Sequence, residues 1–520
     1  MQLLQHRLVR ALGKLLPALL PALLFIPIVL SPPLNHDVAA VLNFSERWLN
    51  GEQLYVDLID VNPPLIYVLN LLPALLEQIT PLDGVRSLQL CLFLFGLYAW
   101  FLAFRARDRR VEGATERALL DVMPALFLFC GGYDFGQREH LMAVAALPYI
   151  LAACRREAGQ RPLGGVAIGV LAGVCFALKP HFLAVPALIE VAVVVGRGRL
   201  GWAVAWRRTW RDPVLIAMVA VWLAYAISLP VVFPDYLNVV VPLVWDFYVD
   251  LGGLSVWDVM LMPRMATALL LLLPLLAIAA RQLLQPAGAL PRMLLLAALG
   301  ALASALAQHK GWSYHIVPIE MFELALGLVL AARWLDGQGV ARTRKAGVHA
   351  ASALTGLFAL YVVSNGEAPW KEFAYAGSDA AGLADLLGEE ARGERVLVLS
   401  PGIWPIFPAL NYADVQMTLR EMNMWLLEGA YETCLPNGHR YREVWEMGRP
   451  EFYMFRTVAE DFARAPPAAV VVDMEPGIPW CGEQFSFVAY FTRHPLFAEV
   501  WSHYHLAASW GRYQVFTRKD

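Results

Sequence analysis

Asn35 to Tyr67, NHDVAAVLNFSERWLNGEQLYVDLIDVNPPLIY, is a polar stretch that directly follows an apolar run and precedes a mostly apolar chain. Its carboxylates include Asp37, Glu46, Asp57 and Asp60. Of the 520 residues, 58% are hydrophobic and only 16% are charged, whereas soluble domains average about 25% charged residues. The composition therefore predicts a polytopic membrane protein in which this polar stretch lies outside the hydrocarbon.

Apolar runs near the length of about 20 residues that crosses a bilayer predict about eleven spanning helices, with an error of one or two. They are 15–34, 86–104, 117–132, 140–154, 163–178, 182–196, 212–233, 259–281, 292–308, 315–334 and 346–363. The first run would be a signal peptide if the chain were cleaved near residues 38–40. It is longer than the apolar core of about 7–15 residues typical of such peptides, so we expect an uncleaved helix.

The short run 65–76 decides which loops lie on which side. If it lies in the interface, nearly all loop arginines and lysines fall on one side, which the positive-inside rule assigns to the cytoplasm. The N-terminus is then cytoplasmic, and 35–85 is a single outer loop with interfacial helices. The other outer loops are 133–140, 179–181, 234–258 and 308–314.

The composition of the chain changes after residue 364. Residues 365–520 contain no run long enough to span, but they hold β-like runs at 395–400, 468–473 and 512–517 between helical stretches at 379–390 and 454–464. This pattern predicts a small soluble α/β domain, and the parity of the spans places it outside. The fold class expected is thus a mostly α transmembrane bundle, 1–364, followed by an outer α/β domain, 365–520.

Cysteine usage bears on this placement. Four of the six cysteines fall in or beside apolar runs, where a thiol behaves as a small hydrophobe. Cys434 and Cys481 are the two in the C-terminal domain. In an exported domain such a pair favours a disulfide, although two free thiols remain the alternative.

Several function classes lack a sequence signal. There is no P-loop, no GxGxxG after a strand, no CxxC and no HExxH, so nucleotide-driven chemistry has no visible site. The formal net charge of −3 gives no reason to expect a nucleic-acid partner.

Three outer segments pair a cation with a histidine: GQREH, KPH and HKGWSYH. Their candidate binding residues are Arg138, His140, Lys179, His181, Lys310, Tyr314 and His315. Arginine and lysine suit a phosphate or pyrophosphate, and an imidazole beside them can donate to it. The alternative for an isolated lysine is snorkelling to the lipid head groups. Asp134 and Glu139 in the second outer segment are secondary acidic candidates.

Asp37 lies a few residues beyond the first apolar run, where a rigid element would hold it at the membrane surface. A carboxylate there can accept a proton as a general base, or it can simply cap a helix. Asp60 belongs to Asp60-Val-Asn-Pro-Pro64, which reads as a turn into a helix because proline suits a helix start and keeps the preceding residue extended. We keep Asp60 as a secondary acidic candidate.

The order of these elements resembles the GT-C superfamily of integral membrane glycosyltransferases, of the protein O-mannosyltransferase and lipid A aminoarabinose transferase type. The resemblance rests on one helix, an outer loop with Asp37 near its start, the G-x-x-x-Y-x-D motif from Gly51 to Asp57 and the D-x-N-P-P-L motif from Asp60 to Leu65, then many helices and an outer domain. It implies inverting transfer of one sugar from a polyprenyl phosphate to a glycan, lipid or protein acceptor, on the periplasmic side of a bacterial inner membrane.

The resemblance also implies that Asp37 is the catalytic carboxylate. The family often has Asp-Glu at this point, whereas this chain has Asp37-Val38. A divalent metal ion near Asp37, Glu139 or His140 is therefore left open.

Two other function classes fit the same composition. A transporter or flippase for a lipid-linked sugar would also need outer cations, but no inverted repeat with broken helices at matching positions is evident. A non-catalytic protein of cell-envelope assembly is the third interpretation.

Overall fold

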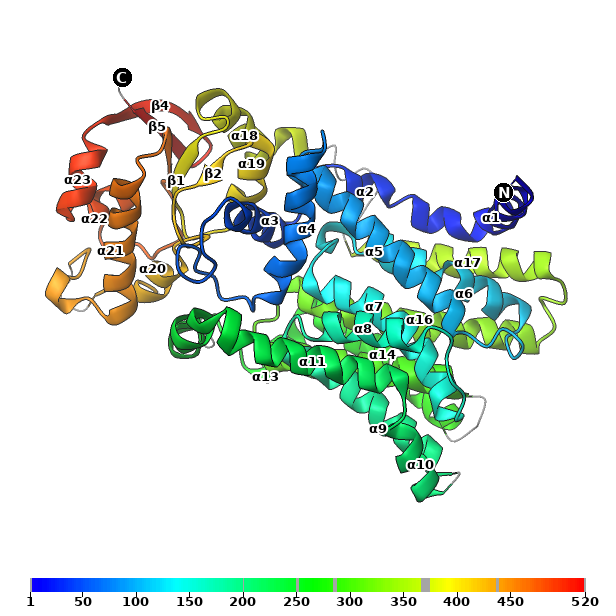
Figure 1. Ribbon diagram of the computed structural model, residues 1–520. Helices are drawn as coiled ribbons and strands as arrows, with labels where there is room; N and C mark the ends of the chain where they lie inside the picture. Colours follow the sequence, from blue (N-terminus) through cyan, green and yellow to red (C-terminus); the bar gives the residue numbers. More distant parts are fainter. Residues whose placement is uncertain are drawn as a thin grey trace. The chain divides into compact units, whose positions relative to one another are not determined.

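The computed structural model describes residues 2–199, 201–248, 252–283, 288–365, 375–435 and 439–518. Contacts gather the chain into two compact units, each built from segments far apart in sequence. The helical unit comprises Met1–Ser31, Leu90–Ser228 and Gly252–Lys371, and the α/β unit comprises Pro32–Gln89, Leu229–Leu251 and Glu372–Asp520. Figure 1 labels the elements of both units.

Nine of the eleven predicted spans lie in the helical unit as separate helices or helix pairs, and α5 (Gly84–Ala106) and α11 (Pro213–Val232) each belong partly to both units. The other elements of the helical unit are α1 (Gln2–Leu23), α2 (Ile26–Leu30), α6 (Ala114–Phe129), η1 (Gly132–Asp134), α7 (Arg138–Glu157), α8 (Gly165–Phe176), η2 (Pro180–Leu183), α9 (Ala184–Gly198), α10 (Trp202–Thr209), α13 (Val256–Leu261), α14 (Pro263–Leu283), α15 (Ala289–Gln308), α16 (Ser313–Gly337) and α17 (Arg344–Ser364).

Six segments among the described residues are long and apolar enough to cross a membrane: Gly84–Ala106, Pro180–Gly198, Pro213–Val232, Ala289–Gln308, Ser313–Gly337 and Arg344–Ser364. Shorter apolar helices accompany them at Gly13–Leu23, Leu65–Ile79, Gly165–Phe176 and Pro263–Ala279. The predicted class, a multi-pass helical membrane protein with a small C-terminal sheet, is confirmed.

Two predicted helices are interrupted. The run 15–34 is divided into α1 and α2 around residues 24–25, and Pro27 lies in the first turn of α2, a position where its missing N–H costs nothing. The run 259–281 is divided at Met262, whose extended backbone separates α13 from α14. Pro263 begins α14 and pushes the residue before it out of the helical region.

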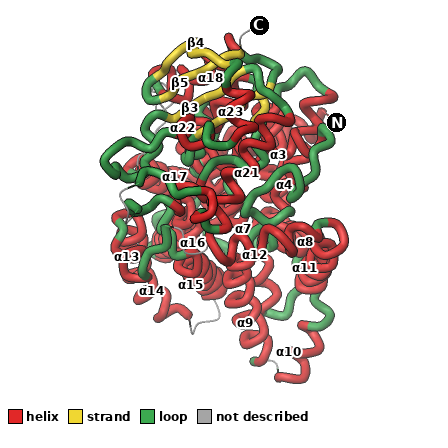
Figure 2. Tube along the Cα trace, turned by 90° about the vertical axis from the view of Figure 1, so that its left-hand side faces the viewer, coloured by secondary structure: helices red, strands yellow, loops and turns green. Residues whose placement is uncertain are grey.

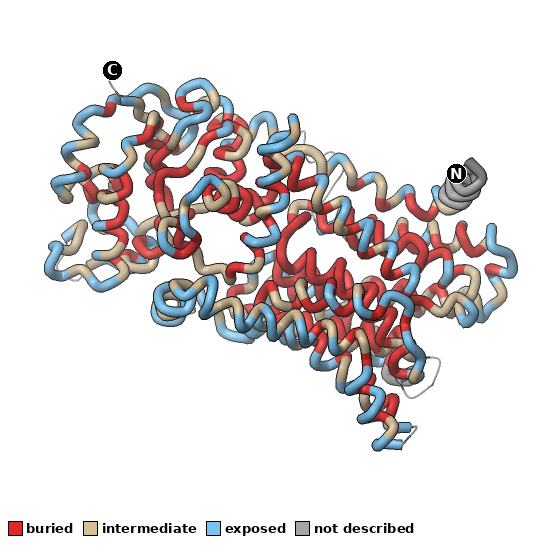
Figure 3. Tube along the Cα trace, in the orientation of Figure 1, coloured by how far each residue is buried: buried red, intermediate tan, exposed pale blue. Residues whose placement is uncertain are grey.

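The core of the helical unit is formed by α6 and α7. All but two residues of each helix are buried, as the long red segments in Figure 3 show. The helix α6 packs on α16 and α17, and α7 packs on α8, α9, α15 and α16. A helix that is buried all round belongs to the centre of a bundle, and this explains why α7 is rich in alanine.

The α/β unit combines the first outer loop with the C-terminal residues. Its elements are α3 (His36–Leu49), α4 (Leu65–Ile79), η3 (Tyr236–Val240), α12 (Val241–Leu243), η4 (Val244–Tyr248), α18 (Asp379–Glu390), β1 (Arg395–Leu399), α19 (Ile406–Ala413), β2 (Gln416–Met417), α20 (Trp425–Ala430), η7 (Val444–Glu446), α21 (Arg449–Arg464), β3 (Ala469–Asp473), α22 (Phe487–Phe491), α23 (Pro495–Trp501), β4 (Tyr504–Trp510) and β5 (Tyr513–Arg518).

The five strands form one mixed sheet in the order β2-β1-β3-β5-β4. The strand β1 pairs in parallel with β2 and β3, with Val398 opposite Val471, and β5 runs antiparallel to β3 and β4. Every residue of β3 is buried, as expected for a central strand covered on both faces. The helices α18 and α19 lie on one side of the strands and α21 to α23 on the other (Figure 1). Figure 2 shows the described strands in yellow.

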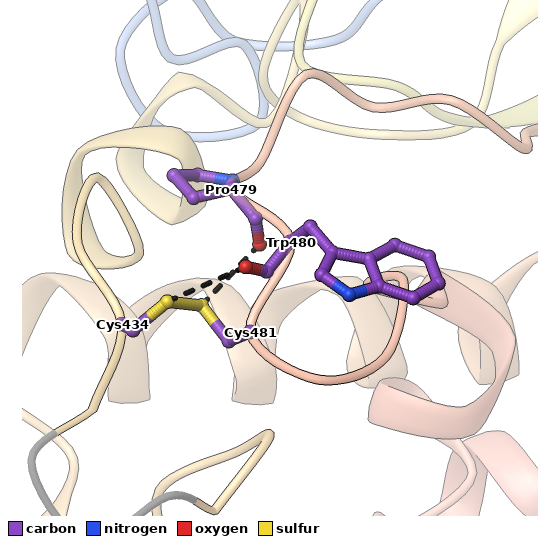
Figure 4. The surroundings of a disulfide bond; sticks show 4 residues. All are labelled: Cys434, Pro479, Trp480 and Cys481. Atoms are coloured by element: carbon purple, nitrogen blue, oxygen red, sulfur yellow. Dashed lines mark hydrogen bonds between the residues drawn. A yellow bond between two sulfur atoms is a disulfide. The ribbon is translucent and has the colours of Figure 1, made fainter.

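The first outer loop folds onto this C-terminal sheet domain. The helix α3 packs on α19, and Ile59 N–H donates to the Arg420 carbonyl at 2.6 Å in a short parallel bridge. Cys434 and Cys481 form a disulfide in the same unit, with Pro479 and Trp480 beside it (Figure 4). The domain boundary at residue 364 follows a change of composition, and it stays a prediction.

Candidate functional site

The helical unit brings two of the three predicted cationic segments together at a buried ion pair. Lys179, which precedes η2, places Nζ 2.6 Å from Oε1 of Glu139 in the first turn of α7. Lys179 is 8% exposed and Glu139 is 1% exposed. Charges this deeply buried are retained only when they are paired, so this contact fixes the end of α8 against the start of α7.

The third segment adds a polar and aromatic wall to this pair. Gln308, the last residue of α15, accepts a hydrogen bond from Lys179 Nζ at 3.2 Å. The Tyr314 ring lies 5.1 Å from the same ammonium group. The His315 ring lies 4.5 Å from the Tyr314 ring, and its Nε2 is 4.0 Å from Oε1 of Glu139.

Lys310 joins the cluster through Trp312. Its Nζ lies 5.1 Å from the Trp312 ring, which is 5.5 Å from the His315 ring. The charges of Arg138, Lys179 and Lys310 all act on the His315 ring. Glu139 is the carboxylate of this group, and Lys179 is its ion-pair partner. We call this group of Arg138, Glu139, Lys179, Lys310, Tyr314 and His315 the cationic cluster.

His140 is held by the backbone on both sides. Its Nδ1 accepts from the Gly136 N–H at 3.2 Å, and its Nε2 lies 2.9 Å from the Phe127 carbonyl. Because Nδ1 accepts, the ring proton is on Nε2 and is donated to that carbonyl. His140 therefore joins the end of α6 to the loop before α7, a structural role that the sequence did not predict.

The remaining candidates of the helical unit are His181 and Asp134, whose contacts differ from those of the cationic cluster. The His181 ring stacks edge-on against Phe182 at 5.2 Å, within electrostatic range of Lys179 and Arg138. Asp134 lies in η1, 3.9 Å from Nη1 of Arg264, which also binds Glu320 at 2.7 Å. Asp134 is thus a member of an Asp–Arg–Glu group.

The α/β unit holds Asp37 in the first turn of α3. Asn35 caps this helix, and its Oδ1 accepts from the Asp37 N–H at 3.0 Å. His36 Nε2 lies 3.6 Å from the Asp37 carboxylate. A negative charge in the first turn is favoured by the helix dipole, so this position suits an ionised carboxylate.

The C-terminal domain anchors the helix that carries Asp37. Asn411 Nδ2 donates to the Ala39 carbonyl at 3.1 Å, and the Leu34 N–H donates to the Tyr412 hydroxyl at 2.8 Å. Both contacts lie within a few residues of Asp37. The soluble domain is therefore part of the structure that orients this carboxylate.

Asp60 forms the turn expected from its sequence. Its Oδ2 accepts from the Asn62 N–H at 2.9 Å and from the Tyr67 hydroxyl at 2.5 Å. Tyr55 donates to the Asn62 carbonyl at 2.6 Å. These bonds fix the entry to α4.

Glu46, on α3, is half-buried beside a second carboxyl. Burial, and after it the charge of Glu77, raises the pKa of Glu46 to about 8. Burial also raises the pKa of Glu77, although the Gly84 N–H donates to this carboxyl at 2.9 Å. The two carboxyls share a proton at neutral pH, because like charges at close range do not both ionise.

Some residues of these sites carry weak sequence signals. Gln308 ends an apolar helix and has no charge to reveal it, whereas Arg264 and Glu320 are charges inside apolar runs, a recognised sign of a functional or paired group.

Within the described ranges, no three His, Cys, Asp or Glu side chains gather so as to hold a metal ion.

Comparison with known proteins identifies the fold. No protein-family model matches the sequence, and no curated protein matches it. Among solved structures, the chain is similar to ArnT from Cupriavidus metallidurans bound to undecaprenyl phosphate, with a TM-score of 0.55 and 15% identity over 97% of this chain and 98% of that one. The apo structure of the same protein gives a TM-score of 0.48 and 15% identity over 94% and 93% of the two chains.

ArnT is the lipid A aminoarabinose transferase, a GT-C protein. The similarity extends over nearly the full length of both chains, so it includes the first outer loop and the C-terminal domain as well as the helices. The chain therefore shares its overall fold with this protein, as the resemblance noted in the first loop predicted.

Proposed function

We propose that the chain is a glycosyltransferase that uses a polyprenyl-phosphate-linked sugar as donor. The observation that carries the proposal is the cationic cluster, in which Arg138, Lys179 and Lys310 meet at the ends of apolar helices. Such a group suits the phosphate of a lipid carrier. The fold is shared with a protein whose structure holds undecaprenyl phosphate, which supports the same class of donor.

In the proposed reaction a hydroxyl or amine of the acceptor attacks the anomeric carbon of the sugar. The new bond forms on the face opposite the phosphate, the carbon–oxygen bond to the phosphate breaks, and its electron pair leaves with the phosphate. The Asp37 carboxylate accepts the proton of the acceptor. Lys179, Lys310 and Arg138 stabilise the negative charge that grows on the leaving phosphate.

We propose further that the site faces the periplasm of a bacterial inner membrane, with the N-terminus in the cytoplasm. The predicted cytoplasmic loops carry most of the loop arginines, and the Cys434–Cys481 disulfide suits an oxidising compartment. Turnover with a panel of acceptors determines whether the acceptor is a glycan, a lipid or a protein.

Binding of the carrier tests the proposal without knowledge of the sugar. The full chain, purified in detergent, is titrated with undecaprenyl phosphate and followed by its thermal shift. We expect Lys179→Met to weaken binding by about tenfold or more, since a charge-assisted contact contributes about 1.5–3 kcal/mol. Lys345→Met, at the exposed start of α17, is the matched control and should leave binding unchanged.

Turnover separates the transferase from the other two classes. Purified protein is supplied with labelled polyprenyl-phosphate sugars and a panel of acceptors, and release of the free lipid phosphate is measured. Asp37→Asn should lower turnover by at least about a hundredfold, as loss of a general base does, while Asp57→Asn in the same loop should retain it. Full activity of Asp37→Asn would rule out the assigned base, and movement of the intact lipid across vesicles without release would indicate a flippase.

A further inference from the structure

A second candidate site lies in the helical unit, far from the cationic cluster. It is a cavity of about 790 Å³, within the range of about 300–1,000 Å³ of small-molecule sites. Arg155 lines it near the end of α7, whereas Glu139 begins that helix. Sixteen residues at 1.5 Å each separate the two by about 24 Å. The cavity is therefore distinct from the proposed donor site.

The carboxylates that line this cavity already have partners. Glu112 binds Arg107 at 2.5 Å, Glu116 binds Arg333 at 2.8 Å, and Glu157 binds Arg292. Asp336 accepts from the backbone N–H groups of Thr115 and Glu116 at 2.9 and 3.1 Å, and Asp108 accepts from that of Arg110 at 3.3 Å. Three of the five lining carboxylates are thus neutralised by arginines, and the other two accept hydrogen bonds from the backbone.

Two arginines of the lining take no part in these ion pairs. Arg155 and Arg199 line the cavity, and within the part of the chain that the structure describes neither makes a hydrogen bond or an ion pair through its side chain. The Nε of Arg155 is buried without an acceptor, and such a group costs about 1–3 kcal/mol until a ligand satisfies it.

A helix terminus adds to this positive character. Ala289 and Leu290 at the start of α15 line the cavity, and among the described residues no side chain caps this helix. The first N–H groups of a helix of 20 residues carry the positive end of its dipole. Together with the two arginines, they favour an anion.

Apolar side chains complete the lining, among them Val111, Leu120 and Leu151. The cavity lies at the ends of α9 and α16, both of which belong to segments long and apolar enough to cross a membrane. Its arginines therefore lie at the depth of lipid head groups, where basic pockets between spanning helices recognise anionic lipids. A ligand with a phosphate and an apolar portion fits this lining better than a free anion.

We propose that this cavity binds the head group of an anionic glycerophospholipid of the cytoplasmic leaflet, with Arg155 and Arg199 on its phosphate. The leaflet follows from the predicted sidedness of the arginine-rich loops. The proposal does not depend on the transfer reaction, so failure of either leaves the other standing.

Native mass spectrometry of the delipidated full chain tests it with defined probes. The probes are dioleoylphosphatidylglycerol, dioleoylphosphatidylcholine and glycerol 3-phosphate. We expect Arg155→Gln/Arg199→Gln to weaken phosphatidylglycerol binding by at least about tenfold. The control Arg207→Gln/Arg211→Gln removes two exposed charges from α10 and the turn that follows it, outside the cavity, and should change binding less than twofold.

A second variant distinguishes loss of lipid binding from loss of folding. Ala158→Trp fills the cavity from an exposed position of its lining and keeps every charge. It should weaken phosphatidylglycerol binding while the arginines remain.

Several results would overturn the proposal. Equal losses in the two double variants would show general surface electrostatics. Equal binding of phosphatidylcholine would show no selection for charge. Competition by glycerol 3-phosphate at the same concentration as the lipid would identify a site for a free anion.

Discussion

Arg47 is a fully buried guanidinium that holds the first outer loop to the C-terminal domain. Its Nη1 donates to the Leu419 carbonyl at 2.8 Å, and its Nη2 binds Glu52 at 2.6 Å. Glu52 in turn binds Arg395 at 2.8 Å. Arg47 therefore satisfies acceptors on both sides of the contact between loop and domain.

We expect Arg47→Met to lower the free energy of unfolding by about 3–5 kcal/mol, as the loss of one partner of a buried ion pair does. Chemical denaturation in detergent, followed by tryptophan fluorescence, measures this. Arg464→Met is the control, because Arg464 is 55% exposed and lies 3.4 Å from Asp57. Exposed pairs contribute only about 0–1 kcal/mol, so similar losses in the two variants would contradict the anchoring role of Arg47.

The raised pKa of Glu46 predicts how the stability of the fold depends on pH. Its pKa is raised from 4.5 to about 8 in the folded chain, by burial first and then by Glu77, Asp414 and Asp83. Between these pH values the folded state keeps a proton that the unfolded state releases. Stability is thus present below about pH 4.5 and is lost as the pH rises through about 8.

Glu46→Gln, which replaces the protonated carboxyl by a neutral amide, should reduce this loss. The apparent Tm of the wild type should fall between pH 5 and pH 9, and that of the variant should fall less. Glu390→Gln, at the exposed end of α18, should behave like the wild type. Parallel pH profiles for all three proteins would show that Glu46 is ionised in the folded state.

At the scale of single residues, the sequence predicts which chemical groups form a site better than it predicts which residues contact one another. The three segments with cations beside histidines are recognisable from composition, and Lys179, Tyr314 and His315 do lie together. The role of His140 depends on two backbone groups, those of Gly136 and Phe127, that no local pattern reveals.

At the scale of elements, the helix α19 holds α3 in place and thereby orients Asp37. Tyr412 accepts the Leu34 N–H at 2.8 Å, three residues before Asp37. Tyr412→Phe removes only this acceptor. If Asp37 is the base, we expect kcat to fall about three- to tenfold, by about 0.7–1.4 kcal/mol, with KM and Tm unchanged.

Tyr441→Phe is the matched control for this positioning role. Tyr441 bonds the backbone of Ser486 in the same unit, away from α3, so the variant should keep the wild-type kcat. A fall in Tm with no change in kcat for Tyr412→Phe would show that the contact only stabilises the fold.

Element boundaries follow the sequence where local signals are strong. The strands expected at 395–400, 468–473 and 512–517 form as β1, β3 and β5, because β-branched apolar runs suit buried strands. The sequence missed β2, which has two residues, and β4, most of which is exposed. Neither has the apolar pattern that marks a strand, and both form because a neighbouring strand offers its edge.

At the scale of the whole molecule, the first outer loop and the C-terminal residues form one unit although more than 280 residues lie between Gln89 and Glu372. No sequence pattern predicts this pairing, because it rests on single contacts such as Arg395 with Glu52 and Asn411 with Ala39. By contrast, the alternation of apolar runs and arginine-rich loops predicts the order of the helices, since the membrane requires apolar length in each of them.

Sidedness is the property of the whole molecule on which the proposed chemistry depends. The loop arginines predict a cytoplasmic face that includes α10 and a periplasmic face that includes the C-terminal domain. The Cys434–Cys481 disulfide points the same way, because such bonds persist in oxidising compartments. Arg207 on α10 and Glu390 on α18 are both exposed, so each can report on its own side once replaced by cysteine.

Arg207→Cys and Glu390→Cys are made singly in a chain whose four free cysteines are replaced by alanine. In intact spheroplasts a membrane-impermeant maleimide should label Glu390→Cys and not Arg207→Cys, and lysis should allow both to react. Without a reductant, the parent chain should remain unlabelled in either state, because its two remaining cysteines are joined. Labelling of Arg207→Cys in intact spheroplasts would invert the topology and place Asp37 and the cationic cluster on the cytoplasmic side.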